Sequence, residues 1–192
     1  MTVLITCMEK EFDKKLAEVF IREGYEVISG TNATKKPEKL DFLVDTTDYR
    51  PETDSGLNPD TIEQAFRKNV LAPMGLLEEY LPMLDKGEGK RLFYLTSAIA
   101  SINETREKEK YAYNMSKAAL HQFIQMVRNK LAPEGYTIRV FDPLFGELDT
   151  EAAAEAAFNY ITRRRGTENH DPNRDDEATI VIRDANGRQH GW

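Results

Sequence analysis

The chain has 192 residues, of which 40% are hydrophobic, and a net charge of −7 at pH 7. This length suits a single domain, residues 1–192, with one sizeable core. The acidic balance argues against nucleic acid or an anionic membrane as the main partner, because both favour a basic protein surface. The sequence shows no apolar run of membrane-spanning length and no basic-then-apolar leader, so we expect a cytoplasmic protein.

In chain order, the apolar patterns predict alternating strands and helices. Short continuous apolar runs indicate strands covered on both faces, and apolar residues at helical spacing indicate helices. The predicted strands lie at residues 2–6, 25–29, 41–44, 92–95, 138–141 and 180–182, and the helices around 16–24, 61–84, from 113 onward, and 150–163. Pro73 is expected to bend the second helix after Ala72. This alternation predicts an α/β fold with a doubly wound parallel sheet, Rossmann-like.

Tyr113 and Lys117 begin the third predicted helix and stand four residues apart. Residues at this spacing share a helix face, so the Lys117 ammonium can lie beside the phenol of Tyr113 and favour its ionised form. Tyr113 could then act as an acid or base near neutral pH. The alternative interpretation is a tyrosine packed at a helix start and a solvated lysine.

Other segments stand in a consistent order around this helix. A strand-like run ends in Thr96-Ser97, the preceding long helix contains Lys68-Asn69-Val-Leu-Ala-Pro73, and Ile138-Arg-Val-Phe-Asp-Pro143 follows. Together with Tyr113-Asn-Met-Ser-Lys117, these segments resemble the classical branch of the short-chain dehydrogenase/reductase family, from about Met1 to about Thr150. The longer spacing between Ser97 and Tyr113 is accommodated by a surface insertion at residues 103–110.

The resemblance implies a catalytic tetrad of Ser97, Tyr113, Lys117 and Asn69. In this family, the serine holds a substrate carbonyl or hydroxyl, the tyrosine gives or takes its proton, the lysine lowers the pKa of the phenol, and the asparagine holds a relay water. The implied substrate is therefore a small carbonyl or hydroxyl compound.

The sequence departs from the family in the region that binds the dinucleotide. The glycine-rich phosphate turn is replaced by Thr6-Cys7-Met8-Glu9-Lys10-Glu11-Phe12-Asp13, a degenerate motif without glycine. Its acids, including Glu11 and Asp13, stabilise a helix N-terminus but repel phosphate. The single cysteine, Cys7, is interpreted as structural.

Two further departures affect the same region. Only Gly30 to Leu40 separate the second and third predicted strands, which is too short for the family's next helix and third strand. The family's Asn-Asn-Ala-Gly is replaced by Asp45-Thr46-Thr47-Asp48. We therefore expect a shortened fold that uses no cofactor, with altered NAD(P) binding as the alternative.

Three functions stay open from the sequence. The favoured one is a cofactor-independent proton transfer of the isomerase, dehydratase or lyase type, since the tetrad can polarise a carbonyl without a hydride. The alternatives are an NAD(P)-dependent carbonyl or alcohol oxidoreductase with an atypical cofactor site, and a non-catalytic subunit of a hetero-oligomer with a family paralogue.

The helices at residues 61–84 and 113 onward carry wide apolar faces. In the family such helices pair between subunits, which implies a homodimer, homotetramer or hetero-oligomer; alternatively, both pack only on the chain's own sheet.

Residues 163–165 are arginines, which we interpret as a charge cluster at a helix C-terminus in preference to an anion-binding site. A charged loop at 167–177 stands where the family has a substrate lid. The three histidines show no metal-ligand spacing, so we assign no metal.

Overall fold

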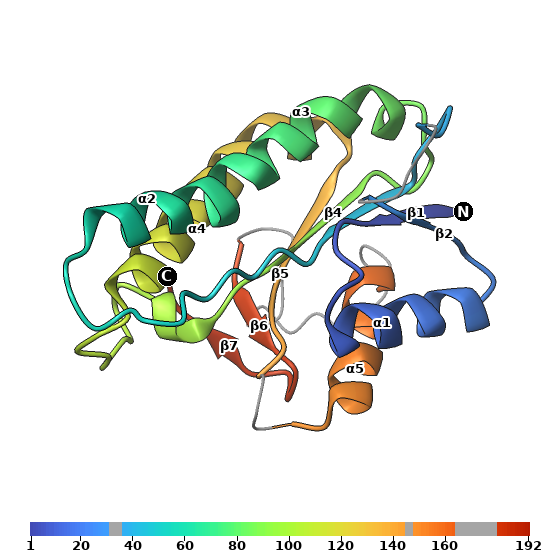
Figure 1. The fold of residues 1–192 in the computed structure, drawn as a ribbon. Helices are drawn as coiled ribbons and strands as arrows, with labels where there is room; N and C mark the ends of the chain where they lie inside the picture. The colour runs from blue at the N-terminus through green and yellow to red at the C-terminus, as the bar shows by residue number, and fades with distance from the viewer. Residues whose placement is uncertain (31–35, 145–147, 164–179) are drawn as a thin grey trace.

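The computed structural model describes residues 1–30, 36–144, 148–163 and 180–192 (Figure 1). These residues form a seven-stranded sheet in the order β2-β1-β3-β4-β5-β6-β7, parallel except at the β6–β7 pair. The prediction of a doubly wound, Rossmann-like α/β fold is confirmed. The strands are β1 (Thr2–Ile5), β2 (Glu26–Ser29), β3 (Phe42–Asp45), β4 (Arg91–Leu95), β5 (Thr137–Asp142), β6 (Ile182–Asp184) and β7 (Gln189–His190).

Helices cover both faces of the sheet (Figure 1). Helices α1 and α5 lie on one face, and the α2–α3 segment and α4 lie on the other. The helical elements are α1 (Glu11–Arg22), α2 (Pro59–Phe66), η1 (Arg67–Leu71), α3 (Ala72–Leu84), η2 (Ala98–Ala100), α4 (Tyr111–Leu131), η3 (Ala132–Glu134) and α5 (Thr150–Thr162).

The central strands are buried on both faces because their side chains alternate between two apolar cores. Leu43 and Leu92 point into the core beneath α3 and α4, whereas Val44 and Phe93 point into the core beneath α1 and α5. A fully buried side chain of this kind contributes about 1.5–3 kcal/mol. This two-sided burial explains why the strands read as continuous apolar runs in the sequence.

The link between β2 and β3 is short. Residues 36–41 form neither helix nor strand, and β2 lies at an edge of the sheet. The shortening predicted from the sequence is therefore present in the described part of this link, whose residues 31–35 lie outside the described ranges. Among the described residues no strand lies beyond β2, and β1 pairs with β2 on one side and β3 on the other.

Pro73 changes the helical geometry instead of ending the helix. The segment α2–η1–α3 is continuous, and η1 is a π-helical turn that contains Asn69. Proline has no N–H to donate to the carbonyl four residues earlier, which here belongs to Asn69, and a wider turn is one way to absorb that loss. The predicted irregularity is thus found just before Pro73.

The C-terminal third agrees with the sequence only in part. Helix α5 occupies the predicted range, but the strand expected at 180–182 begins at Ile182 and lies near an edge of the sheet, followed by the unpredicted β7. Antiparallel pairing of β6 and β7 uses the turn at Gly187 (φ 79°), a positive φ that favours glycine. Arg164, Arg165 and the expected lid lie outside the described residues.

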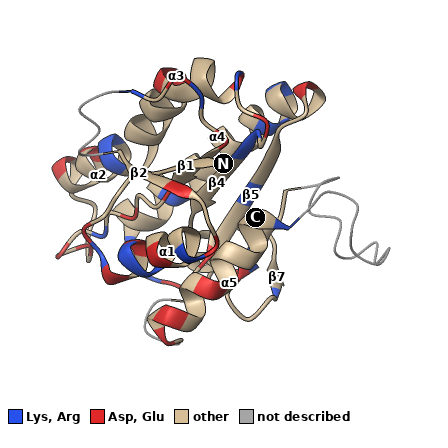
Figure 2. Ribbon diagram, turned by 90° about the vertical axis from the view of Figure 1, so that its right-hand side faces the viewer, with Lys and Arg blue, Asp and Glu red and all other residues tan. Residues whose placement is uncertain are grey.

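Acidic and basic residues are interspersed along the chain, and α1 carries both signs (Figure 2). Among the described helices, none has the length and apolar character needed to cross a membrane. Within the same ranges, no group of three or more His, Cys, Asp or Glu residues is placed to hold a metal ion.

Candidate active site

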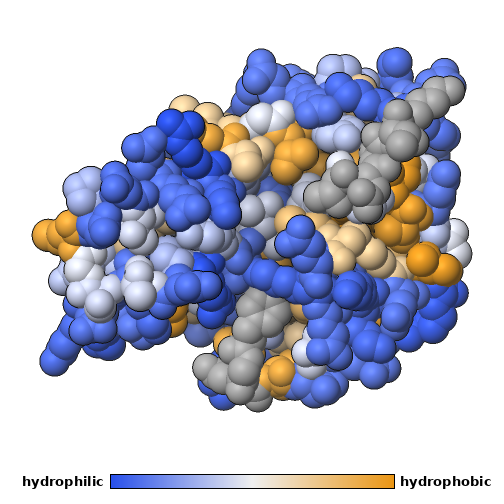
Figure 3. Space-filling view, in the orientation of Figure 1, coloured by the Kyte–Doolittle hydropathy of each residue, from blue (hydrophilic) through white to orange (hydrophobic). Residues whose placement is uncertain are grey.

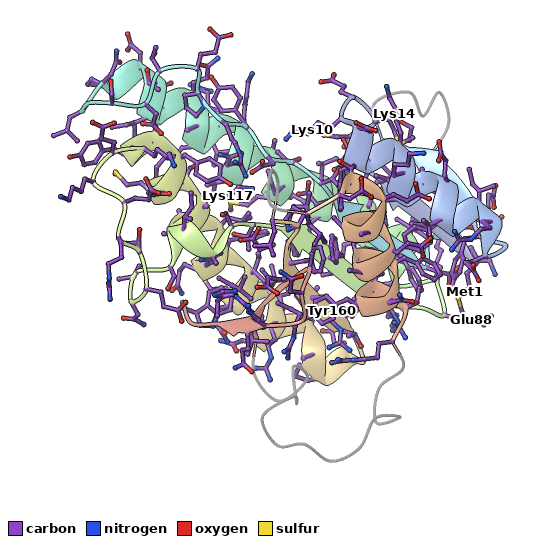
Figure 4. All side chains as sticks on the ribbon, turned by 90° about the horizontal axis from the view of Figure 1, so that it is seen from below. Met1, Lys10, Lys14, Glu88, Lys117 and Tyr160 are labelled. Carbon is purple, nitrogen blue, oxygen red and sulfur yellow. The ribbon has the colours of Figure 1, made fainter. Side chains whose placement is uncertain are left out.

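The predicted site residues gather at the carboxyl ends of the parallel strands. Because β1, β3, β4 and β5 run in the same direction, the loops that follow them meet at one edge of the sheet, where ligands of open α/β folds bind. Helix α4 begins beside this edge and supplies Tyr113 and Lys117, both buried. Figure 4 shows Lys117 on α4 and Lys10 at the start of α1.

Tyr113 and Lys117 share one partner, the carboxylate of Asp48. The Tyr113 hydroxyl donates to Asp48 Oδ1 at 2.8 Å, and Lys117 Nζ lies 3.3 Å from the same oxygen. Lys117 also donates to the carbonyl oxygens of Thr47 at 2.9 Å and Leu95 at 3.1 Å. An ammonium has three N–H groups and a phenol has one. In this arrangement, the N–H groups of Lys117 and the O–H group of Tyr113 are directed at oxygens of the protein.

Asp48 is surrounded by positive charge. Its Oδ2 accepts from Arg50 Nε at 2.9 Å and lies 3.4 Å from Lys10 Nζ, and only 2% of its side chain is exposed. Burial alone would raise the pKa of Asp48, but the attraction of Lys117, Arg50 and Lys10 outweighs it and holds that pKa well below its usual range. Asp48 is therefore an ionised, buried carboxylate.

The environment of Tyr113 favours the protonated phenol. Burial raises the pKa of Tyr113 well above its ordinary value, and the negative charge of Asp48 raises it further. The Lys117 ammonium lies 6.0 Å from the centre of the Tyr113 ring, and its own pKa is lowered by burial. The net shift is opposite to the lowered phenol pKa expected from Lys117, because the phenol is buried and the Asp48 carboxylate lies beside both groups.

Asn69 and Ser97 are buried at the same edge and bind other partners. The Asn69 side chain accepts from Tyr49 N at 2.8 Å and donates to Tyr49 O and the Ser116 hydroxyl, both at 2.9 Å. Ser97 donates to Asp142 Oδ2 at 3.3 Å. Asn69 thus joins the loop after β3 to α4, and Ser97 is held at the end of β5.

Asp54 is a residue that the sequence reading missed. Helix α4 starts after Lys110, which has a left-handed conformation (φ 62°) and whose side chain has no acceptor to cap the first turn. The Asp54 carboxylate accepts from the backbone N–H groups of Ala112 at 2.8 Å and Tyr113 at 2.9 Å. A remote aspartate therefore supplies the cap and fixes the turn that carries Tyr113.

The degenerate turn after β1 is held by hydrogen bonds to buried side chains of the protein. Thr6 Oγ1 donates to Asp45 Oδ1 at 3.0 Å, and Lys10 N donates to the buried Asp13 at 3.3 Å. Burial raises the pKa of Asp13 to about 6. Burial, with Asp13 and Asp45 nearby, also raises the pKa of Cys7, which keeps its thiol protonated and agrees with a structural role.

Two cavities meet at Arg50. A cavity of about 720 Å³ lies over the start of α1 and the end of β3, and is lined among others by Glu9, Lys10, Glu11 and Asp48. A second cavity of about 450 Å³ lies on the other side of Arg50 and reaches Tyr113. The Arg50 guanidinium lies 5.0 Å from the centre of the Tyr113 ring. The Arg50 side chain therefore separates the larger cavity from the phenol.

Comparison with known proteins identifies the family. The family model described as short chain dehydrogenase matches residues 31–159, which is more than half of the chain. The chain belongs to the short-chain dehydrogenase family. Solved structures agree: a carbonyl reductase from Pseudomonas aeruginosa PAO1 in complex with NADP has a TM-score of 0.75 at 14% identity and covers 100% of this chain and 99% of its own. The carbonyl reductase Sniffer of D. melanogaster has a TM-score of 0.70 at 16% identity, covering 98% and 87%.

Curated relatives give a similar result over shorter segments. C-signal of Myxococcus xanthus is 31% identical over 86 residues, 45% of this chain and 52% of that protein. The 1-hydroxy-2-glutathionyl-2-methyl-3-butene dehydrogenase of Rhodococcus sp. (strain AD45) is 25% identical over 169 residues, 83% and 74% of the two chains. For six of the curated relatives, the match spans about half or less of their length. This member of the short-chain dehydrogenase family therefore shares its fold with carbonyl reductases.

Proposed function

We propose that this short-chain dehydrogenase relative carries out no NAD(P)-linked hydride transfer and acts as a non-catalytic subunit. The observation that supports the proposal is the engagement of Tyr113 and Lys117 by Asp48 (2.8 and 3.3 Å). A dinucleotide and a carbonyl substrate both need hydrogen-bond donors at this centre, and here the donors are bound to protein oxygens.

The region where the family binds the cofactor phosphates also does not fit a dinucleotide. Glu9 and Glu11 line the larger cavity at the N-terminus of α1, where the helix dipole would otherwise favour a phosphate. The backbone N–H of Lys10 donates to the Asp13 carboxylate. This N–H at the helix start is therefore already bound by an acid of the chain and is not open to a phosphate. These residues do not fit NAD(P) bound in the manner of the family.

A cofactor-independent proton transfer, the function favoured from the sequence, receives less support from the geometry. The raised pKa of Tyr113 disfavours its use as a base, and Asp48, with its depressed pKa, is a weak base. Isomerase, dehydratase or lyase chemistry would require Asp48 to leave the phenol before a substrate could take its place.

The subunit role is supported by apolar side chains on the helical layer. Leu71 and Met74 in η1 and α3, and Met115 and Met126 in α4, are exposed, with Met126 at 62%. Figure 3 shows apolar residues between hydrophilic ones over the α3 layer. Exposed large apolar side chains of this kind suit a contact with another chain. The partner we propose is a paralogue of the same family.

A second candidate is an NAD(P)-dependent carbonyl or alcohol oxidoreductase. The family match and the cavity of about 720 Å³ at the carboxyl ends of β1 and β3 favour it, since open α/β sheets bind dinucleotides there. In this case Asp48 would have to release Lys117 when the cofactor enters.

Calorimetric titration of the purified chain with NADH and NADPH separates the two candidates. We expect no saturable heat and no turnover of small aldehydes, ketones or alcohols. A Glu9→Gln/Glu11→Gln variant is the matched control, because it removes two cavity acids and leaves Asp48 in place. Saturable micromolar binding to the wild type, with turnover, would establish the second candidate instead.

Light scattering tests the subunit role separately. We expect the chain alone to self-associate or to gain the mass of a co-expressed family paralogue. A Met115→Lys/Met126→Lys variant should lose that association while keeping its fold, because both side chains are exposed. A wild-type chain that stays monomeric in both conditions would contradict the role.

A further inference from the structure

The groups around Asp48 have the arrangement of a carboxylate-binding site. One carboxylate oxygen is bound by the Tyr113 hydroxyl and lies beside Lys117, and the other is bound by Arg50 and lies beside Lys10. The four groups come from α4, from the start of α1 and from the loop after β3. Each oxygen of one planar carboxylate therefore has two partners, an arrangement that favours a carboxylate over a spherical anion.

We propose that Tyr113, Lys117, Arg50 and Lys10 form a binding site for a small carboxylate, and that Asp48 fills this site from within the chain. The inference rests on the proposed function in one respect, namely that no cofactor competes for Tyr113 and Lys117. The chemical class of ligand is a small monocarboxylate that carries the planar group now supplied by Asp48.

The binding groups keep other contacts when the Asp48 carboxylate is taken away. Lys117 is held by the carbonyls of Thr47 and Leu95, and the Arg50 guanidinium lies over the Tyr113 ring. The Lys10 ammonium donates to the backbone carbonyl of Asp48 at 2.6 Å, a contact that survives truncation of the side chain. The site should therefore persist in an Asp48→Ala protein.

The positive charges around Asp48 provide the affinity of the site for a carboxylate. Three cations surround one buried carboxylate, and Lys117 is completely buried. Removal of one partner from a buried ion pair is strongly destabilising because the other charge is left uncompensated. An external anion that restores the neutralising charge then recovers part of the energy that Asp48 normally supplies, less the cost of its own lost translational freedom. The cavity of about 720 Å³, which Asp48, Arg50 and Lys10 line, gives such an anion a route into the site.

The experiment is chemical rescue of Asp48→Ala with sodium formate, the smallest carboxylate. We expect the variant to melt below the wild type and to gain about 5–10 °C at a formate concentration about 100 times its dissociation constant, with the gain rising as the logarithm of formate concentration. Sodium chloride at equal ionic strength is the salt control. A gain from formate no larger than that from chloride would overturn the proposal.

Asp45→Ala is the matched control. Asp45 is a buried aspartate at the end of β3, three residues before Asp48, but its carboxylate accepts from the neutral Thr6 hydroxyl and the Thr47 N–H. Formate should therefore stabilise Asp48→Ala and leave Asp45→Ala and the wild type unchanged relative to chloride. An equal formate response in both variants would show that formate enters either cavity left by a truncated aspartate, which would also overturn the proposal.

A second variant covers the case in which Asp48→Ala does not fold. Asp48→Ala/Lys117→Met removes the buried ammonium together with its counter-ion, so we expect it to fold and to show no formate response. A formate response of the double variant equal to that of Asp48→Ala would show that Lys117 takes no part in binding the carboxylate, which would overturn the proposal. Titration of the wild type with NADPH, run alongside, separates a failure of the proposed function from a failure of this inference.

Discussion

The carboxylate of Asp54 accepts a hydrogen bond of 2.9 Å from the backbone N–H of Tyr113, a residue 59 positions later in the chain. The same carboxylate binds Ala112 N, and the Asp54 carbonyl accepts from Lys110 N at 2.7 Å. The loop after β3 is thereby attached to the first turn of α4. The position of Tyr113 depends on this remote cap.

Asp54→Ala is expected to lower the free energy of unfolding by about 1–2 kcal/mol, because two N–H groups at the helix start lose their acceptor. Urea unfolding followed by circular dichroism measures this loss. Asp54→Asn keeps one acceptor oxygen and should lose less. Asp60→Ala, a change at an exposed aspartate in the first turn of α2, is the control for loss of charge and should stay within about 0.5 kcal/mol. Equal losses at positions 54 and 60 would contradict the cap.

The raised pKa of Asp13 should make the free energy of unfolding depend on pH. Burial raises the pKa of Asp13 to about 6 in the folded state, above the ordinary value near 3.8. Between these values the folded state binds a proton that the unfolded state releases, so this contribution to stability is present below pH 4 and is lost as pH rises through 6. Asp13→Asn keeps an acceptor for Lys10 N and removes the charge. We expect it to be more stable than the wild type by about 1–3 kcal/mol at pH 8 and to differ little at pH 4.

Urea unfolding of both proteins across pH 4–8 tests this prediction. The difference in unfolding free energy between variant and wild type should grow with pH and level off above about pH 7. A constant difference over the whole range would show that Asp13 is already ionised at pH 4 and that its burial carries no penalty.

The fold could be predicted from the sequence because its causes are local. Strands such as Val3–Ile5 are apolar on both faces, and Tyr113 and Lys117 are one helical turn apart, so pattern alone indicates the sheet and the shared helix face. The π-helical turn was foreseeable only as an irregularity near Pro73. Strand β7 was missed because it has two residues and polar character.

The site could be predicted only as a list of residues. Asp48 was recognised as a substitution for glycine, but its pairing with Tyr113 joins residues 65 positions apart, and no short-range pattern encodes such a contact. Spacing placed Lys117 near Tyr113 and so suggested a lowered phenol pKa. The carboxylate beside both groups reverses that conclusion, since the pKa depends on every neighbouring charge and on burial.

Trp192 reports on a pH-sensitive contact at the C-terminal segment. His190 contacts Asp184 at 2.9 Å and Glu104 at 3.3 Å; burial opposes protonation, but the two carboxylates raise the pKa of His190 above 6.5. The resulting stabilisation is fully present below pH 6.5 and is lost as pH rises through the raised pKa. Trp192, the chain's single tryptophan, packs against the ring of His121 at 5.0 Å and donates to Ile180 O.

We expect the fluorescence of Trp192 to shift toward longer wavelength at lower urea concentrations at pH 8.5 than at pH 6. A His190→Gln variant keeps a polar side chain without the titration, so its fluorescence transition should depend less on pH over this interval. The same pH dependence in wild type and variant would assign it to other groups.

Tyr113→Phe tests the hydrogen bond to Asp48 without changing the ring. The hydroxyl donates to a buried carboxylate at 2.8 Å, and hydrogen bonds to charged groups contribute about 1.5–3 kcal/mol, so the variant should fold but lose stability of that order. Tyr94→Phe is the matched control, because the Tyr94 hydroxyl is buried on β4 and has no hydrogen-bond partner among the described residues. Its removal should leave the free energy of unfolding unchanged or raise it. Urea unfolding of both variants decides the point: a loss at position 94 as large as at position 113 would mean that removal of any buried hydroxyl causes the loss, and that the Asp48 contact does not.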